Sequence, residues 1–159
     1  MTLLPFFEWC EATLVGQAIR DSLWLFPVIE AIHLVAFAAL GGTILLVDLR
    51  LLGLLFRSQP AGRLVEDVRP WQRASLAAAL ASGSLLFLSE PMKLYYSGPF
   101  WVKIACLVPA ILLTFTVRPR VARADEPGKG PFRSRLAAIV SIALWSGVAW
   151  GGRWIGFSG

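Results

Sequence analysis

Long apolar runs alternate with short polar segments along this chain. Four apolar runs, at about 24–47, 74–89, 100–117 and 136–155, have the composition of membrane-crossing helices. An α-helix rises ~1.5 Å per residue, so the first run spans roughly 36 Å, more than the ~30 Å hydrocarbon core of a bilayer. The pattern predicts an all-α fold, an integral membrane four-helix bundle that forms a single transmembrane domain over residues 1–159.

The N-terminal segment, residues 3–20, is too polar to span a bilayer and too apolar to stand free in water. It mixes Phe6, Phe7 and Trp9 with acidic side chains, and its apolar positions fall roughly on one helical face. This pattern predicts a short amphipathic helix at the membrane interface. Acidic residues stand where a signal peptide carries basic ones, so we expect no cleaved targeting peptide.

Two polar segments, 48–73 and 118–135, connect the first run to the second and the third to the fourth. They are strongly basic, with five and six Lys or Arg residues respectively. The opposite side of the predicted bundle carries few basic residues, namely Arg20, Lys93 and Arg153, besides Lys103 just inside its run. By the positive-inside rule, both basic loops are cytoplasmic. We therefore expect a multi-pass protein of the bacterial inner (plasma) membrane with both termini outside the cytoplasm.

The composition points to the same class of protein. Hydrophobic residues make up 57% of the chain and charged residues 16%, against roughly 45–50% and 25% in soluble domains. The net charge of +5 comes mainly from the two loops, where it sets membrane orientation. We therefore expect the lipid bilayer as the main partner and no nucleic acid. Cys10 and Cys106 lack the spacing of a metal or redox motif.

The first run carries two ionisable residues, Glu30 and the only histidine of the chain, His33. They are about one helical turn apart and lie on the same face. Ionisable side chains inside a membrane lose their hydration and need partners, so they mark a candidate functional site. The predicted topology brings further polar and aromatic residues to the same outer side: Glu90, Lys93, Tyr95, Trp101 and Lys103. We predict a polar cluster in the outer half of the bundle.

Three functions are compatible with this cluster. A neutral imidazole in an apolar bundle is a good axial ligand for haem iron, so His33 is a candidate ligand for haem b or a similar cofactor, with Glu30 and Lys103 orienting it. Alternatively, Glu30, His33 and Lys103 form the polar path of a transporter or channel subunit, which predicts a homo-oligomer or a larger membrane complex. In the third hypothesis, the protein is a non-catalytic accessory or assembly subunit, and its polar groups serve only to fix the packing of the helices. No catalytic residue is assigned.

The first run ends in a second pair of charged residues. Asp48 and Arg50 are two positions apart, so they do not face each other on a helix. Each is expected to pair with another element or with lipid head groups at the cytoplasmic end. Small residues also recur at a spacing that lets another helix approach closely, as Ala38 with Gly42 and Gly147 with Gly151. These two faces are the candidate contacts of an oligomer.

Two stretches carry a resemblance to known proteins. The runs IEAIHLVAFAALGGTILLVDLRLLG and SEPMKLYYSGPFWVKIACL resemble an uncharacterised family of small bacterial four-helix membrane proteins. More distantly, the chain resembles copper-resistance-D type proteins and the haem-containing membrane protoporphyrinogen oxidase of bacteria. In this resemblance His33 matches the oxidase histidine, Gly41 and Gly42 its glycine region, and Trp101 with Lys103 a later motif. The resemblance implies that His33 and Lys103 take part in haem binding and activity, with Trp101 in the same motif as Lys103.

Overall fold

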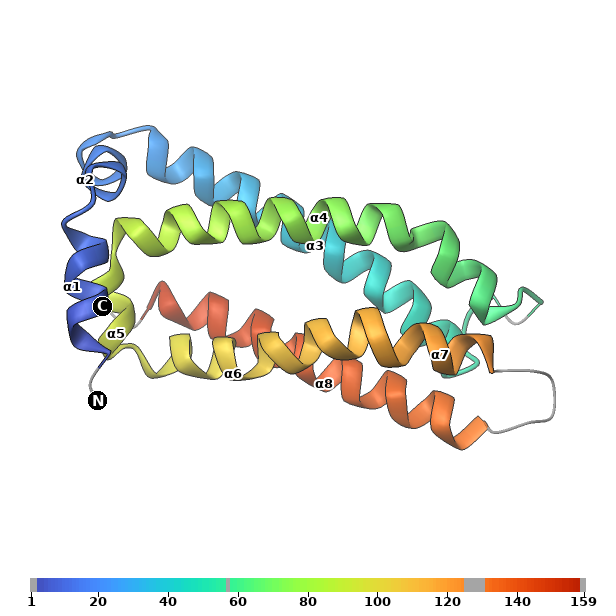
Figure 1. The fold of residues 1–159 in the computed structure, drawn as a ribbon. Coiled ribbons are helices and arrows are strands. Elements are labelled where there is room, and N and C mark those ends of the chain that lie inside the picture. Colours follow the sequence, from blue (N-terminus) through green and yellow to red (C-terminus); the bar gives the residue numbers. More distant parts are fainter. Residues whose placement is uncertain (1–2, 57, 125–130, 158–159) are drawn as a thin grey trace.

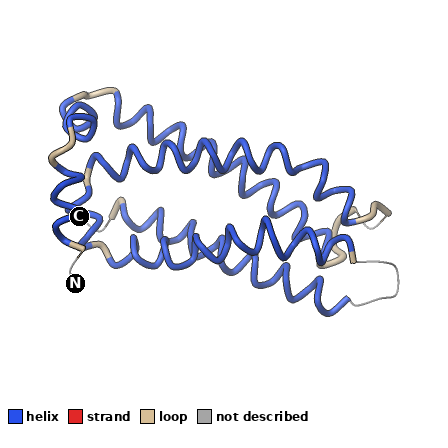
Figure 2. Tube along the Cα trace, in the orientation of Figure 1, coloured by secondary structure: helices blue, strands red, loops and turns tan. Residues whose placement is uncertain are grey.

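In the computed structural model, the described residues 3–56, 58–124 and 131–157 form helices and loops and contain no strand (Figures 1 and 2). In chain order, the elements are α1 (Leu4–Glu11), α2 (Leu14–Asp21), α3 (Leu25–Leu51), α4 (Ala61–Ser89), α5 (Pro91–Tyr96), α6 (Gly98–Leu112), the π-helical turn η1 (Leu113–Val117), α7 (Arg118–Arg123) and α8 (Pro131–Ile155). The all-α class predicted from the sequence is confirmed for this part of the chain.

The long helices pack as antiparallel pairs. Helix α3 packs along α4, α6 packs along α8, and contacts between α3 and α8 join the two pairs (Figure 1). The short helices α1, α2 and α5 lie across one end of the long helices, which we call the capped end. The start of α4, the helix α7 and the start of α8 lie at the other end, which we call the basic end.

Three helical segments are long and apolar enough to cross a membrane, namely 25–51, 98–123 and 132–155. Helix α4 contains the predicted second span but begins earlier. The polar segment 61–73, which the sequence assigns to a loop, is helical and forms the first half of α4. That half carries Arg63, Glu66 and Asp67, so α4 is polar in its first half and apolar in its second.

The loop predicted at 118–135 is also shorter than expected. Residues 118–123 form α7, and α8 already begins at Pro131. Residues 125–130, including Lys129, lie outside the described residues, as does Arg57 of the first basic segment. Both basic segments are therefore partly helical where the structure describes them.

The predicted N-terminal helix, residues 3–20, is divided into α1 and α2. Thr13 adopts an extended conformation between them, and its Oγ1 accepts a hydrogen bond from the N–H of Gly16 at 3.3 Å. This hydroxyl caps the start of α2 and ends the continuous helix. Gly16 lies against α4: a Cβ at this position would be 2.2 Å from the carbonyl oxygen of Leu88. The absence of a side chain lets α2 rest on the end of α4.

Helix α3 is bounded by local signals at both ends. The hydroxyl of Ser22 accepts hydrogen bonds from the N–H groups of Trp24 and Leu25, at 3.4 and 3.2 Å, which pairs donors that a helix start leaves free. Gly53 follows the helix with φ of +77°, a left-handed conformation that glycine adopts at low cost. Asp48 therefore lies within the helix rather than in the following loop.

The apolar core fills the middle and the basic end of the molecule. One cluster, at the basic end, contains Val47, Leu51, Ala61, Leu64, Val65, Ala122 and Ala138. A second cluster, in the middle, contains Leu40, Ile44, Ala110, Trp145 and Val148. Helices α6 and α8 pack closely at two glycines of α8. A Cβ at Gly147 would lie only 2.7 Å from the Sγ of Cys106, and one at Gly151 only 2.8 Å from the carbonyl oxygen of Pro99. The absence of a side chain at both positions therefore allows this packing.

Candidate functional site

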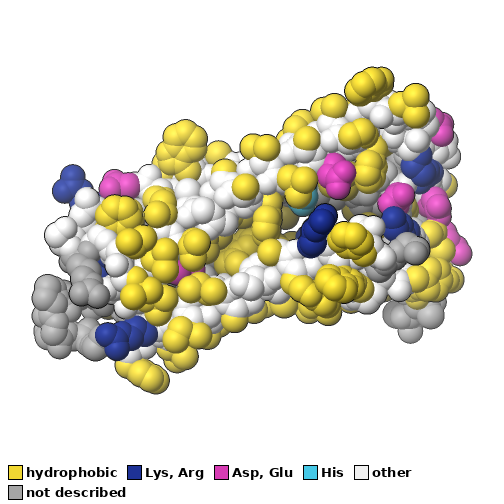
Figure 3. Space-filling view, turned by 180° about the vertical axis from the view of Figure 1, so that it is seen from behind, with side chains coloured by type: hydrophobic (Ala, Val, Ile, Leu, Met, Phe, Trp, Pro, Cys, Tyr) yellow, Lys and Arg dark blue, Asp and Glu magenta, His cyan; other side chains and the backbone are white. Residues whose placement is uncertain are grey.

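The capped half of the molecule is hollow. A cavity of about 530 Å³, which we call the α3–α8 cavity, opens between α3 and α8, and a space of about 430 Å³, the α4–α6 cleft, opens between α4 and α6. Both are lined by His33, Phe37, Gly83, Phe87, Phe100, Lys103 and Val148. Figure 3 shows the hollow from the α3–α8 side, with the histidine and a basic side chain at its edge. The predicted His33 and Lys103 thus stand in the wall that the two spaces share.

Ser82 of α4 lies beside the His33 ring. The Nδ1 of His33 lies 3.1 Å from the Oγ of Ser82, and this Oγ donates its single hydrogen to the carbonyl oxygen of Ala78 at 2.6 Å. With the hydroxyl turned this way, Nδ1 is the donor to Ser82 and the lone pair of the neutral ring lies on Nε2. The ring also interacts with the backbone carbonyl of Ala79. A Cβ at Gly83 would lie 3.0 Å from the His33 Cε1, so this glycine makes room for the ring.

Charged side chains of both signs line the cavity that contains this imidazole. Lys93, Lys103 and Arg153 line the α3–α8 cavity, together with Glu30 and Glu90. Lys93 pairs with Glu90 at 3.5 Å. Neither Glu30 nor Lys103 has an ion-pair partner among the residues that the structure describes. Five residues of the predicted cluster thus line this cavity, namely Glu30, His33, Glu90, Lys93 and Lys103, and no ion pair joins Glu30 to Lys103.

Trp101 and Tyr95 build the wall and the cap of the cleft. The Nε1 of Trp101 donates to the backbone carbonyl of Tyr95 at 3.0 Å, and Trp101 lines the α4–α6 cleft. The ring of Tyr95 packs edge-on against Phe7 of α1, with centroids 5.1 Å apart. Tyr95 is not a lining residue of either space, so its place is in the aromatic packing that holds α1 over the capped end.

A second polar centre lies buried near the basic end. The Nη2 group of Arg118 donates to a carboxylate oxygen of Asp48, to the Ser141 hydroxyl at 3.0 Å and to the Ile44 carbonyl at 3.1 Å. Ser141 in turn donates to the second Asp48 oxygen at 2.8 Å. Arg118 is 1% exposed and Asp48 0%. The centre thus ties α3, α7 and α8 together.

This centre bears on two sequence-based expectations. Of the two partners expected for Asp48, another element or lipid head groups, the structure shows another element, because its carboxylate pairs with Arg118. Arg118, assigned to a basic loop, is buried inside the protein. Arg50 lies apart from this centre, and its Nε donates to the carbonyl of Gln59 at 2.8 Å. The sequence held three signals of this buried centre. Asp48 stands at the end of the first apolar run, Ser141 lies inside the fourth, and Arg118 directly follows the third.

A π-helical turn positions Arg118. Pro119 has no N–H, and its ring clashes with the carbonyl four residues earlier, so the regular α-helical ladder is broken there. The turn η1 directly precedes this break and carries Thr114, whose Oγ1 accepts from the Nε1 of Trp145 at 3.1 Å. The Nε and Nη1 atoms of Arg118 are buried without a hydrogen-bond partner in the structure.

The fold and the site define a class: an all-helical protein with apolar helices long enough to cross a membrane and a cavity that carries a histidine in its wall. Among the described residues, no group of three or more His, Cys, Asp or Glu side chains is placed to hold a metal ion. The chain belongs to a family of unknown function, DUF6644, whose model matches residues 6–158. No curated protein and no solved structure matches this chain. The resemblance to an uncharacterised family is confirmed, whereas the comparisons give no support to the resemblance to copper-resistance-D type proteins or the haem-containing oxidase.

Proposed function

We propose that this chain is a four-helix bundle of the bacterial inner membrane that binds haem b, with His33 as the axial ligand. In this proposal α3, the second half of α4, α6 and α8 cross the bilayer. Helices α1 and α2 lie at the outer interface, and both termini are outside the cytoplasm. The haem occupies the α3–α8 cavity in the outer half of the protein.

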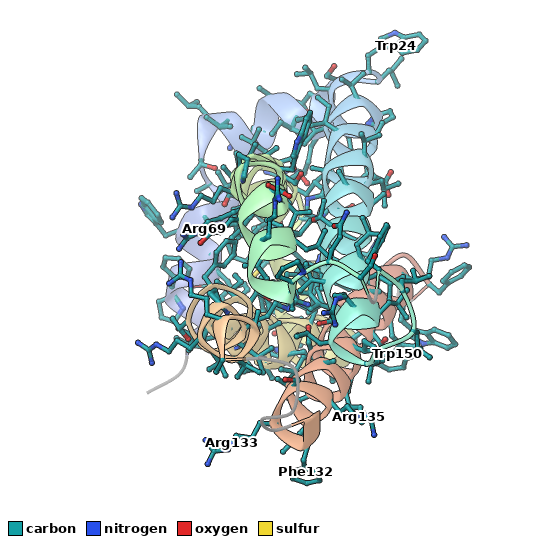
Figure 4. All side chains as sticks on the ribbon, turned by 90° about the vertical axis from the view of Figure 1, so that its right-hand side faces the viewer. Trp24, Arg69, Phe132, Arg133, Arg135 and Trp150 are labelled. Carbon is teal, nitrogen blue, oxygen red and sulfur yellow. The ribbon has the colours of Figure 1, made fainter. Side chains whose placement is uncertain are left out.

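The surface of the molecule supports the membrane placement. Large apolar side chains project from the long helices and are more than half exposed, among them Leu34, Val35, Val108, Leu112 and Ile139. Such a surface is costly in water and favourable in hydrocarbon. Seen from the basic end, Arg133 and Arg135 project away from the start of α8, and both side chains are exposed (Figure 4). Exposed arginines at this end favour its cytoplasmic orientation.

The observation that carries the haem proposal is the His33 imidazole in a cavity wall, with its Nδ1 3.1 Å from the Ser82 hydroxyl. A haem-ligating imidazole needs one nitrogen fixed by a hydrogen bond, and Ser82 lies where it can accept that bond from Nδ1. Phe26, Phe37 and Phe87 give the cavity aromatic walls suited to a flat macrocycle. Lys93, Lys103 and Arg153 provide cations for its carboxylates. The chain's donor set therefore fits haem, which would bring redox chemistry to the site.

Absorbance spectroscopy tests this proposal. We expect protein purified from cells supplied with haem precursor to show a Soret band that is lost in His33→Ala. Ser82→Ala is expected to weaken haem retention roughly 10- to 100-fold, because it removes the group that orients the imidazole. Ser84→Ala is the matched control, since Ser84 lies on the same helix but donates only to the Leu80 carbonyl at 2.8 Å. A wild-type protein without a Soret band, or an unchanged band in His33→Ala, excludes His33 ligation.

The apolar core favours this proposal over a transport path. Leu40, Ile44 and Trp145 belong to the buried apolar cluster between the cavity and the basic end, so apolar side chains fill this part of the long axis. In addition, Gly147 and Gly151 already pack against α6 within the chain, so this face is not free for an oligomer contact. A transporter made from this fold would have to open its core.

A further inference from the structure

We propose that the buried Asp48–Arg118 centre is a binding site for an internal water molecule, which Arg118 and Gln72 of α4 hold through their free N–H groups. The Nε and Nη1 atoms of Arg118 and the Nε2 atom of Gln72 are buried and have no hydrogen-bond partner among the described residues. The two residues are 1% and 3% exposed. This site lies beyond the proposed function and depends neither on haem nor on the orientation of the chain in the membrane.

The register of the helices places Gln72 beside this centre. Helices α3 and α4 are antiparallel, and His33 of α3 lies opposite Ser82 of α4, with Nδ1 and Oγ 3.1 Å apart. Counting the same number of positions along both helices from this contact brings Ile44 to the level of Gln72. The carbonyl of Ile44 accepts a hydrogen bond from the Nη2 group of Arg118 at 3.1 Å. Gln72 and Arg118 are therefore at the same level of the bundle.

The apolar neighbours of Gln72 lead to the same place. Val68, one turn earlier on α4, packs against the cluster at the basic end, and Leu76, one turn later, packs against the middle cluster. On α3, Val47 belongs to the first of these clusters and Ile44 to the second. Gln72 and the polar centre thus lie where the two apolar clusters meet.

The chemistry of the free groups selects the ligand. All three free atoms are N–H donors, so the ligand must accept hydrogen bonds. The Asp48 carboxylate already neutralises Arg118, and a second anion would leave a net negative charge in an apolar core, which is costly. Water accepts hydrogen bonds without adding charge. The donor set therefore favours water over a halide ion.

The π-helical turn before Arg118 provides an acceptor for the hydrogens of the water. Pro119 has no N–H, so the turn η1 lacks the hydrogen bond that this position would otherwise donate to one of its carbonyls. Internal water molecules typically make about three hydrogen bonds to buried groups that lack other partners. The donors of Arg118 and Gln72, together with such a carbonyl, supply this number.

A double-mutant cycle tests whether a ligand joins the two side chains. Gln72→Leu removes the amide at similar volume, and Arg118→Lys keeps the charge beside Asp48 without Nε or Nη1. We expect Gln72→Leu to lower the Tm in detergent micelles by at least about 3 °C, and by less in the Arg118→Lys background. Gln17→Leu, the same change at an exposed glutamine, is the matched control. An unchanged or raised Tm in Gln72→Leu overturns the proposal, because replacing an amide without a partner does not destabilise the protein.

Nuclear magnetic resonance detects the water directly. In isotope-labelled protein in deuterated detergent, we expect rotating-frame Overhauser cross-peaks from the water resonance to the side-chain amide of Gln72 and to Hε of Arg118. Their sign separates them from hydrogen exchange, and they need only the wild-type chain, so this measurement stands even if Arg118→Lys does not fold. Coupling in the cycle without these cross-peaks means that Oε1 of Gln72 contacts Arg118 directly, and it overturns the proposal. A Tm that falls when gluconate replaces chloride at constant ionic strength identifies an anion instead of water and also overturns it.

Discussion

At the scale of single residues, the Asp48–Arg118 pair has the largest expected effect on stability. Removing one partner of a buried ion pair leaves the other charge without compensation, which costs about 3–5 kcal/mol. We therefore expect Asp48→Ala to lower the free energy of unfolding by about that amount in detergent micelles. The double variant Asp48→Ala/Arg118→Met removes both charges and should recover most of the loss. Denaturant-induced unfolding followed by circular dichroism measures both.

A surface ion pair provides the control for this prediction. Glu66 and Arg123 join α4 to α7 at 3.3 Å, but their side chains are 59% and 58% exposed. Exposed pairs contribute only about 0–1 kcal/mol, because water and salt screen them. Glu66→Ala should therefore stay within about 1 kcal/mol of the wild type. A similar loss in Glu66→Ala and Asp48→Ala would show that burial does not set the value of these pairs.

Sequence reasoning located the residues of the cavity better than those of the buried pair. Glu30, His33, Glu90, Lys93 and Lys103 line one cavity because helical spacing and antiparallel connections bring their positions to the same end. Whether they bind a cofactor stays a prediction. The partner of Asp48 was not predictable in the same way: an arginine at the end of an apolar run has the same pattern whether it faces the cytoplasm or turns inward.

At the scale of helices, glycine positions separate the faces that pack from those that do not. A Cβ at Gly151 would lie 2.8 Å from the Pro99 carbonyl oxygen and 2.9 Å from the Lys103 Cβ, whereas one at Gly42 meets no atom within 4 Å. Gly151→Ala should therefore push α6 from α8 and destabilise the protein by about 1–3 kcal/mol. Gly42→Ala should be neutral or stabilising, because alanine favours a helix more than glycine. Thermal unfolding in detergent compares the two variants.

The predicted faces of small residues thus have different roles. Gly147 and Gly151 are occupied inside the chain, so only the Ala38 and Gly42 face of α3 remains exposed to its surroundings. Should Gly42→Ala destabilise the protein as much as Gly151→Ala, this face would be packed against a second copy. An oligomer of this chain stays a prediction for that face alone.

Helix boundaries were the least predictable feature at this scale. The segment 61–73 has the charges and prolines of a loop, yet it is helical because Leu64 and Val65 are buried in the core at the basic end. Tertiary packing overrides local propensity in such cases. The turn η1 has a local cause, because Pro119 interrupts the α-helical hydrogen bonds. The sequence alone does not show that the helix responds with a π-helical turn instead of a kink.

At the scale of the whole molecule, packing and charge are distributed unequally between the two ends. The middle and the basic end hold the apolar core and the buried ion pair, while the capped half holds the α3–α8 cavity and the α4–α6 cleft. The packed core and the ion pair hold the helices against one another in one half, while the helices of the other half leave the two spaces between them. The sequence indicated this polarity through its charges but not the hollow, because cavities depend on how side chains from different helices meet.

The same asymmetry predicts an orientation that chemical labelling can measure. Leu23 is 89% exposed at the capped end, and Arg133 is exposed at the basic end. A membrane-impermeant maleimide should label Leu23→Cys in intact cells and Arg133→Cys only after the inner membrane is opened, because basic segments stay on the cytoplasmic side. The background from the native thiols should be low: Cys10 is buried and burial raises its pKa, while Cys106 packs toward Gly147. Labelling of Arg133→Cys in intact cells would place the basic end outside and reverse the topology, and labelling of both positions would mean that the chain is not inserted as proposed.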